Sequence, residues 1–165
     1  MFRFWRRFAF LRAPSPRARA LAALARRDYA TAERELDALL EGGEAAPAAS
    51  AARERAFLHN KRGVARIGCN RPDDARADFD AALRWVANYP PALTNLGNLL
   101  LEQGRVDDAI ARYQAAILAD PDYAVAHLNL GVAYKRAGRV EEGVRELRAS
   151  QRLERANFLR RRRPS

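Results

Sequence analysis

The sequence predicts an all-α fold, a solenoid of antiparallel helix pairs with about eight helices. The prediction depends on one pattern that is written twice within Leu93–Gly143. NLG at Asn95–Gly97 returns at Asn129–Gly131, 34 residues later, and GRVDDA at Gly104–Ala109 returns at the same interval as GRVEEG. A period of this length is typical of repeat architectures, in which each unit buries its apolar face by stacking on the next unit.

The composition fits a single array of such units with basic ends. The chain has 165 residues, one Cys and a formal net charge of +10. Residues 1–27 hold eight Arg and no acid, and residues 152–165 hold six Arg and one Glu, so the middle of the chain is mildly acidic. This asymmetry indicates ends that touch an anionic surface, either lipid or nucleic acid. Heavy use of Arg and Ala indicates a GC-rich coding sequence, and we expect a bacterial, cytoplasmic protein.

Residues 1–15 form a basic aromatic leader. It has neither the roughly 20 apolar residues of a bilayer span nor the apolar core and cleavage site of a secretory signal. On a helix most of its rings would share one broad face and three of its arginines the other, although Phe10 and Arg12 break this pattern. The leader could therefore lie on an anionic membrane and place the protein at the inner membrane face. The alternatives are a disordered basic leader and a segment that packs its rings on the array. The residues of this predicted surface are Arg3, Trp5, Arg6, Arg7 and Phe8.

Residues 16–51 predict a degenerate helix pair followed by a linker. Pro16 closes the leader, and periodic apolar residues predict two helices on either side of a turn near Asp28. The second helix is expected to stop at the Gly-Gly sequence that begins at Gly42. The small residues after it predict a loop, and the next helix is expected over Ala52–Gly68.

Three further helix pairs are predicted at residues 56–89, 90–123 and 124–157, before a basic tail at residues 158–165. Pro90–Pro91 is expected to terminate the second helix of the first of these pairs. Four adjacent Arg in the tail are expected to be solvated and disordered. Each second helix opens with two acids, which favour the positive end of a helix dipole. Because they recur in identical phase we interpret them as structural and not as catalytic or metal-binding pairs: Asp73–Asp74, Asp107–Asp108 and Glu141–Glu142.

Glycine recurs in the middle of each first helix, at Gly63, Gly97 and Gly131. Glycine inside a helix costs about 1 kcal/mol relative to alanine. Its return at a fixed period therefore indicates close approach of a neighbouring helix.

The segment NLGNLLLEQGRVDDAIARYQAAILADP closely resembles a tetratricopeptide repeat (TPR). The resemblance includes the LG pair, the Gly before the turn, the small residue and aromatic of the second helix, and the Asp-Pro ending. It is close for residues 91–123 and 124–153, weaker for residues 56–89, where Arg62 replaces an apolar residue, and weakest for residues 17–40. It implies a right-handed superhelix that binds protein. The same features favour this family over the pentatricopeptide repeat, which reads RNA, and so disfavour nucleic acid as a partner.

In TPR arrays the first helix of each unit lines a concave groove, so the resemblance implies a site for a peptide segment of a partner protein. An Asn side chain there can pair with both backbone groups of an extended peptide. Alternatively, the Asn residues satisfy the array's own backbone or follow the repeat pattern. The groove positions of a carboxylate clamp hold Asn60, Val125 and Asn129 here. Two Asn of that pattern are matched or nearly matched, but its cations are missing, so a clamp is not expected. The groove candidates are Asn60, Thr94, Asn95, Asn98, Asn129 and Lys135.

No catalytic, cofactor or metal pattern is present in the sequence. His59, His127 and Cys69 fit packing positions, and no nucleophile–histidine signature, phosphate loop or metal-ligand spacing occurs. The sequence therefore predicts a non-enzymatic scaffold or adaptor without cofactor or metal, of undetermined oligomeric state. The alternative is a tether to a membrane or nucleic-acid surface that acts through the basic ends.

Overall fold

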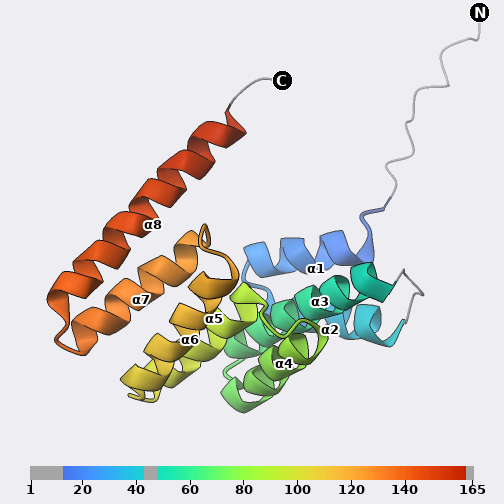
Figure 1. The fold of residues 1–165 in the computed structure, drawn as a ribbon. Helices are drawn as coiled ribbons and strands as arrows, with labels where there is room; N and C mark the ends of the chain where they lie inside the picture. Colours follow the sequence, from blue (N-terminus) through green and yellow to red (C-terminus); the bar gives the residue numbers. More distant parts are fainter. Residues whose placement is uncertain (1–12, 43–47, 163–165) are drawn as a thin grey trace, which may run out of the picture.

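The chain forms a curved stack of helices from α1 at one end to α8 at the other (Figure 1). The computed structural model describes residues 13–42 and 48–162, and in these ranges every regular element is a helix. Each helix packs on the next, and α5 also contacts α3 and α7. The predicted all-α solenoid of helix pairs is confirmed. The helices are α1 (Pro16–Ala25), α2 (Tyr29–Glu41), α3 (Ala48–Gly68), α4 (Pro72–Trp85), α5 (Pro90–Glu102), α6 (Val106–Ala119), α7 (Ala124–Arg136) and α8 (Val140–Arg161).

All four helix pairs turn in the same way. Three residues connect the two helices of each pair, and the middle one has a left-handed backbone conformation. Its φ is 60° at Arg27, 59° at Asn70 and 76° at both Gly104 and Gly138. The next N–H then donates to the carbonyl five residues back at 2.9 Å, as from Arg105 to Leu100. This is the Schellman ending of a helix. Its presence at Arg27 shows that α1 and α2 are joined by the same turn as the later pairs, although no glycine marks it.

The second helices begin with a repeated ion pair. Arg71, Arg105 and Arg139 precede the first turns of α4, α6 and α8, and each Nε donates to the acid three residues later at 2.7 Å. The paired acids therefore lie in first turns, as predicted. In α2 the carboxylate of Asp28 instead accepts from the backbone N–H of Thr31 at 3.2 Å. Asp28 thus satisfies a backbone N–H at the start of α2. In α4, α6 and α8 the first-turn acids favour the positive end of the helix dipole, and the preceding arginines hold them in place.

Three predicted boundaries are wrong. Helix α3 begins at Ala48, within the predicted linker. Pro90 and Pro91 do not terminate α4, which ends at Trp85 before an extended Val86; they occupy the first turn of α5. Proline is suited to that position because its missing N–H would have no partner in the helix. Helix α8 continues to Arg161, so the start of the predicted tail is helical, because no Pro or Gly interrupts it.

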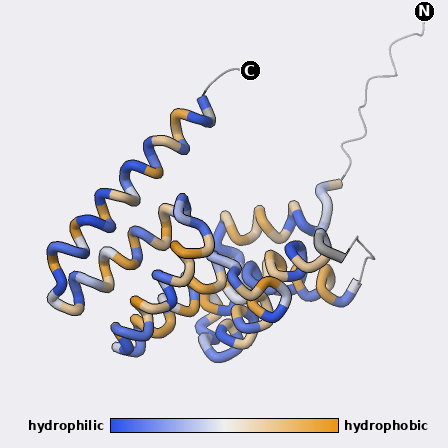
Figure 2. The backbone as a smooth tube through the Cα atoms, in the orientation of Figure 1, coloured by the Kyte–Doolittle hydropathy of each residue, from blue (hydrophilic) through white to orange (hydrophobic). Residues whose placement is uncertain are grey.

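Helices α1 to α7 mix hydrophobic and hydrophilic residues, while α8 is largely hydrophilic (Figure 2). The buried hydrophobic residues form clusters that neighbouring helices share. The mid-helix glycines are close-approach positions, as predicted. A Cβ on Gly63 would meet the Phe79 ring at 2.5 Å, and one on Gly131 would meet Leu147 at 2.8 Å and the carbonyl oxygen of Gly143 at 2.9 Å. The paired helices can therefore pack this closely only without a side chain at these positions.

A buried ion network that the sequence pattern does not reveal joins α2, α3 and α4. Asp78 is 1 % exposed and lies 2.7 Å from Arg62 Nη2 and 3.0 Å from Arg66 Nη1. Arg62 also reaches Asp37 of α2 at 2.7 Å. Burial opposes ionisation of Asp78, but hydrogen bonds with His59 and Arg62 and the charges of both arginines outweigh it and lower its pKa. Arg62 therefore replaces an apolar packing residue with an ionic contact.

None of the described helices combines the length and apolarity that crossing a bilayer takes. The predicted leader surface of Arg3, Trp5, Arg6, Arg7 and Phe8 lies outside the described residues.

Candidate functional site

Helices α3, α5 and α7 lie in sequence along one side of the stack, where α5 contacts both of the others. We call their shared surface the α3–α5–α7 face. Half-buried and exposed residues on it are Val64, Ile67, Asn95, Asn98, Leu101, Val125, Leu128, Asn129 and Val132. Three of the six residues predicted for the groove, Asn95, Asn98 and Asn129, are among them.

Four asparagines on this face form two side-chain pairs. Asn95 Nδ2 donates to Asn60 Oδ1 at 2.9 Å and joins α5 to α3. Asn129 Nδ2 donates to Asn98 Oδ1 at 2.8 Å and joins α7 to α5. The asparagines are thus satisfied in part by one another. Within residues 13–42 and 48–162 no hydrogen bond joins their side chains to the array's backbone, which the alternative interpretation expected.

Asn98 is oriented from below by Tyr113 of α6. The Tyr113 hydroxyl donates to Asn98 Oδ1 at 2.8 Å, so this oxygen accepts two hydrogen bonds. Burial of Tyr113 raises its pKa to about 12, the charge of Arg136 opposing and that of Glu102 adding to this effect. The hydroxyl therefore stays protonated as a donor at neutral pH. Because the oxygen of Asn98 is engaged on both sides, its Nδ2 is the group left for a ligand.

The amide pairs leave further hydrogen-bonding groups available. In the part of the chain that the structure describes, no hydrogen bond engages Asn95 Oδ1, Asn129 Oδ1 or Asn98 Nδ2. All three residues are half-buried. The face therefore offers two acceptors and one NH₂ donor, which is the complement of a short stretch of extended backbone.

A small hollow lies beside these groups. Its volume is about 140 Å³, and its lining comprises Val64, Ile67, Phe79, Asn95, Asn98, Leu99 and Glu102. On α7, Val125, Leu128 and Val132 are 45 %, 40 % and 39 % exposed. Polar groups flanked by apolar surface are typical of ligand-binding sites.

The other three predicted groove residues are not open to a ligand on this face. Thr94 is only 1 % exposed, and its hydroxyl has no hydrogen-bond partner within the described ranges. It points into the core, because one step along a helix from Asn95 turns the side chain by about 100°. Asn60 is 3 % exposed and supports Asn95 from beneath. Lys135 is exposed, with its stem against α8, where a Cβ on Gly143 would meet its Cγ at 2.8 Å.

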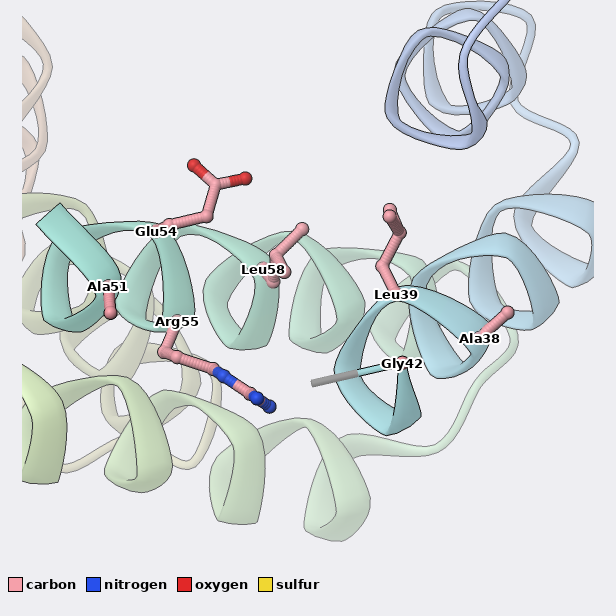
Figure 3. A pocket seen from close by; sticks show the side chains of 7 residues that line it. All are labelled: Ala38, Leu39, Gly42, Ala51, Glu54, Arg55 and Leu58. Atoms are coloured by element: carbon pink, nitrogen blue, oxygen red, sulfur yellow. The ribbon is translucent and has the colours of Figure 1, made fainter. Parts of the chain in front are cut away.

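A second hollow, of about 290 Å³, separates the end of α2 from α3 (Figure 3). Arg55 points across it toward Gly42, and its Nη1 donates to the Leu40 carbonyl oxygen at 2.6 Å. Glu54 points away from Arg55 and pairs with Arg17 of α1 at 2.9 Å. These contacts tie α3 to α1 and α2, so we interpret the hollow as a joint between units.

The histidines serve contacts between helices. His59 Nδ1 lies 3.4 Å from Asp78, and His127 Nδ1 lies 2.6 Å from Glu146. Cys69 is half-buried. Among the described residues, no group of three or more His, Cys, Asp or Glu side chains is arranged to hold a metal ion.

Comparison with known families identifies the repeat. Residues 97–138 match the family model described as TPR repeat. No curated protein sequence matches the chain significantly.

Solved structures share the fold at low sequence identity. MamA superposes with a TM-score of 0.63 at 19 % identity, over 84 % of this chain and 76 % of that one. YrrB, described as a TPR protein with an unusual peptide-binding site, gives 0.61 at 19 % identity, over 87 % and 70 %. The second TPR of Spaghetti (RPAP3), bound to an HSP90 peptide, gives 0.59 at 18 % identity, over 64 % and 91 %. At these identities the likeness concerns the fold alone.

Proposed function

Because this chain is a tetratricopeptide repeat protein, we propose that it is a non-catalytic scaffold that binds an extended segment of a partner protein on the α3–α5–α7 face. The observation that carries the proposal is the set of amide groups left free by the two asparagine pairs. Groups that already have one firm partner are held in place before a ligand arrives, which reduces the entropy lost on binding.

The peptide would lie across α5 from the α3 side to the α7 side. Asn98 Nδ2 would donate to a peptide carbonyl oxygen, and Asn95 Oδ1 and Asn129 Oδ1 would accept from peptide N–H groups. Main-chain contacts of this kind give affinity without demanding a sequence, and pockets for side chains add specificity. The hollow of about 140 Å³ beside Asn95 and Asn98 is apolar on most sides and would take an aliphatic side chain.

Two of the similar structures support a peptide as the ligand. One is described as having a peptide-binding site and the other as bound to a peptide. Both share only the fold with this chain, so the partner itself is to be found by experiment.

A quantitative pulldown with mass spectrometry tests the proposal. The bait would be the full chain, compared with an Asn95→Ala/Asn98→Ala/Asn129→Ala variant. We expect a defined set of proteins to be lost with the variant. The matched control is Asn88→Ala, because Asn88 is exposed in the connection between α4 and α5.

Recovery of the same proteins by both baits would contradict the proposal. Because each lost side-chain hydrogen bond costs about 1 kcal/mol, thermal unfolding followed by circular dichroism must show that the variant is folded at the temperature of the pulldown.

A further inference from the structure

Helix α8 carries a row of arginines on the side turned away from α7. The row recurs at steps of three, four or seven residues, which keeps its members on one side of a helix. It extends about 25 Å at 1.5 Å per residue. Glu146 and Glu154 lie on other sides of the helix, so no acid interrupts the row. Its members, all exposed, are Arg145, Arg148, Arg152, Arg155 and Arg162.

This row is not part of the repeat pattern. In α6, the positions 34 residues before Arg145, Arg148 and Arg152 hold Ala111, Gln114 and Leu118. Stacking of the units therefore does not require basic residues there. Within the described ranges, none of the five arginines in the row forms an ion pair, so their charges face solvent.

Two exposed apolar side chains stand at the C-terminal end of the row. Phe158 is 55 % exposed and Leu159 is 57 % exposed, with Leu159 inside the row itself. The Arg162 guanidinium lies 4.6 Å from the centroid of the Phe158 ring. Helix α8 is the outermost helix, and its C-terminal end projects beyond α7 (Figure 1). The row and the apolar pair thus form an open ridge.

We infer that the outward side of α8 is a docking surface for an anionic lipid bilayer. The five arginines bind lipid headgroup phosphates and carboxylates, and Phe158 and Leu159 enter the boundary between headgroups and acyl chains. Clusters of four to eight basic residues on a helix suit such a surface, and an apolar edge adds to the attraction.

The shape and composition of the ridge favour lipid over nucleic acid. Single-stranded nucleic acid binds in basic grooves, where aromatic rings stack on the bases. Here the charges lie on a ridge, which a flat bilayer can contact along its whole length. Burial of the Leu159 side chain in the bilayer boundary is favourable because it removes apolar surface from water. A phosphate backbone offers no apolar surface to bury it. The surface lies apart from the α3–α5–α7 face, so the inference does not depend on the proposed function.

Vesicle flotation of the full chain tests the inference. We expect the protein to float with phosphatidylcholine vesicles that contain phosphatidylserine, not with pure phosphatidylcholine vesicles, and to be released by salt. An Arg148→Gln/Arg152→Gln variant should partition about thirty-fold less, at the contribution per basic residue expected near an anionic surface.

The control removes the same charge from elsewhere. Arg84 and Arg112 are exposed on α4 and α6, so Arg84→Gln/Arg112→Gln should float like the unchanged protein. Equal flotation of the two double variants would overturn the inference and assign any binding to another basic segment. The inference would also fail if the unchanged protein did not bind the anionic vesicles but bound a DNA duplex in a mobility-shift assay, and the Arg148→Gln/Arg152→Gln variant lost that binding. Phe158→Ser should also lower partitioning, because it removes part of the apolar contact.

Discussion

The ring of Tyr113 lies directly on Gly97, where an added Cβ would come within 2.5 Å of the ring. The hydroxyl of the same side chain donates to Asn98, the next residue, at 2.8 Å. Tyr113 therefore packs on one residue of α5 and orients its neighbour. The core of the array and its α3–α5–α7 face are coupled at this point, so a displaced ring would also displace an amide of the face.

Gly97→Ala is expected to destabilise the protein by about 1–3 kcal/mol, the usual cost of overpacking. The better helix propensity of alanine would offset only part of this loss. Urea unfolding followed by circular dichroism measures the change. A variant as stable as the original protein would show that the ring can move away from α5 without cost.

Tyr113→Phe should make the stability of the protein less sensitive to alkaline pH. Burial raises the pKa of Tyr113 from 10.0 to about 12 in the folded state, so between these values the unfolded chain releases the proton first. The protonated hydroxyl of Tyr113 therefore contributes about 3 kcal/mol to the free energy of unfolding. This contribution is complete below pH 10 and is lost as the pH rises to about 12. Urea midpoints across this window measure the slope, and equal slopes for both proteins would contradict the prediction.

Asn98→Asp should abolish peptide binding without unfolding the array. A carboxylate keeps an acceptor for Tyr113 and Asn129 but replaces the outward NH₂ donor with an oxygen. Binding of a partner peptide found by pulldown would be measured by fluorescence anisotropy. Asn88→Asp adds the same charge in the exposed connection before α5 and should bind normally. Unimpaired binding by Asn98→Asp would remove Asn98 from the proposed contacts.

Asp78→Asn is expected to destabilise the protein by about 3–5 kcal/mol, because Arg62 and Arg66 would keep their charges without their buried partner. Because the pKa of Asp78 is lowered in the folded state, its ionised carboxylate stabilises the protein above pH 3.8, the ordinary pKa of an aspartate. This stabilisation is lost as the pH falls below that value. Acid unfolding should therefore be less steep in the variant. Asp80→Asn, at an exposed position on the same helix, should change neither quantity.

Arg27→Gly should stabilise the protein by about 1 kcal/mol. Arg27 holds a φ of 60°, where Gly104 and Gly138 serve the equivalent turns. A side chain in this conformation costs about 1–2 kcal/mol, and the greater freedom of glycine when unfolded returns part of that. Thermal unfolding measures the gain, with Arg27→Ala as the control that keeps a Cβ. An identical response to both substitutions would mean that the turn is unstrained.

The helices and their close contacts could be predicted because they repeat. The period predicts close approach of a neighbouring helix at Gly97 and sets the acids at the helix starts, so these features recur in each unit. The structure adds that the ring of Tyr113 is what meets Gly97. Asp78 and Arg62 escaped prediction because their pairing occurs in one unit alone. Thr94 was misplaced because a helix turns about 100° per residue, and neighbours in sequence need not share a face. The row on α8 has helical spacing in the sequence, but only the structure shows that α8 continues to Arg161 and that the row lies on exposed surface. The division into repeat units at residues 56, 90 and 124 stays a prediction.

The two asparagine pairs each span a joint between neighbouring units, Asn60 with Asn95 and Asn98 with Asn129. A solenoid bends by small rotations at such joints. Each pair therefore resists bending at its own joint, and helix α5 contributes one residue to both. A strand bound across α5 would link the two joints, so the array would stiffen as a unit and keep one curvature for as long as the strand stays bound.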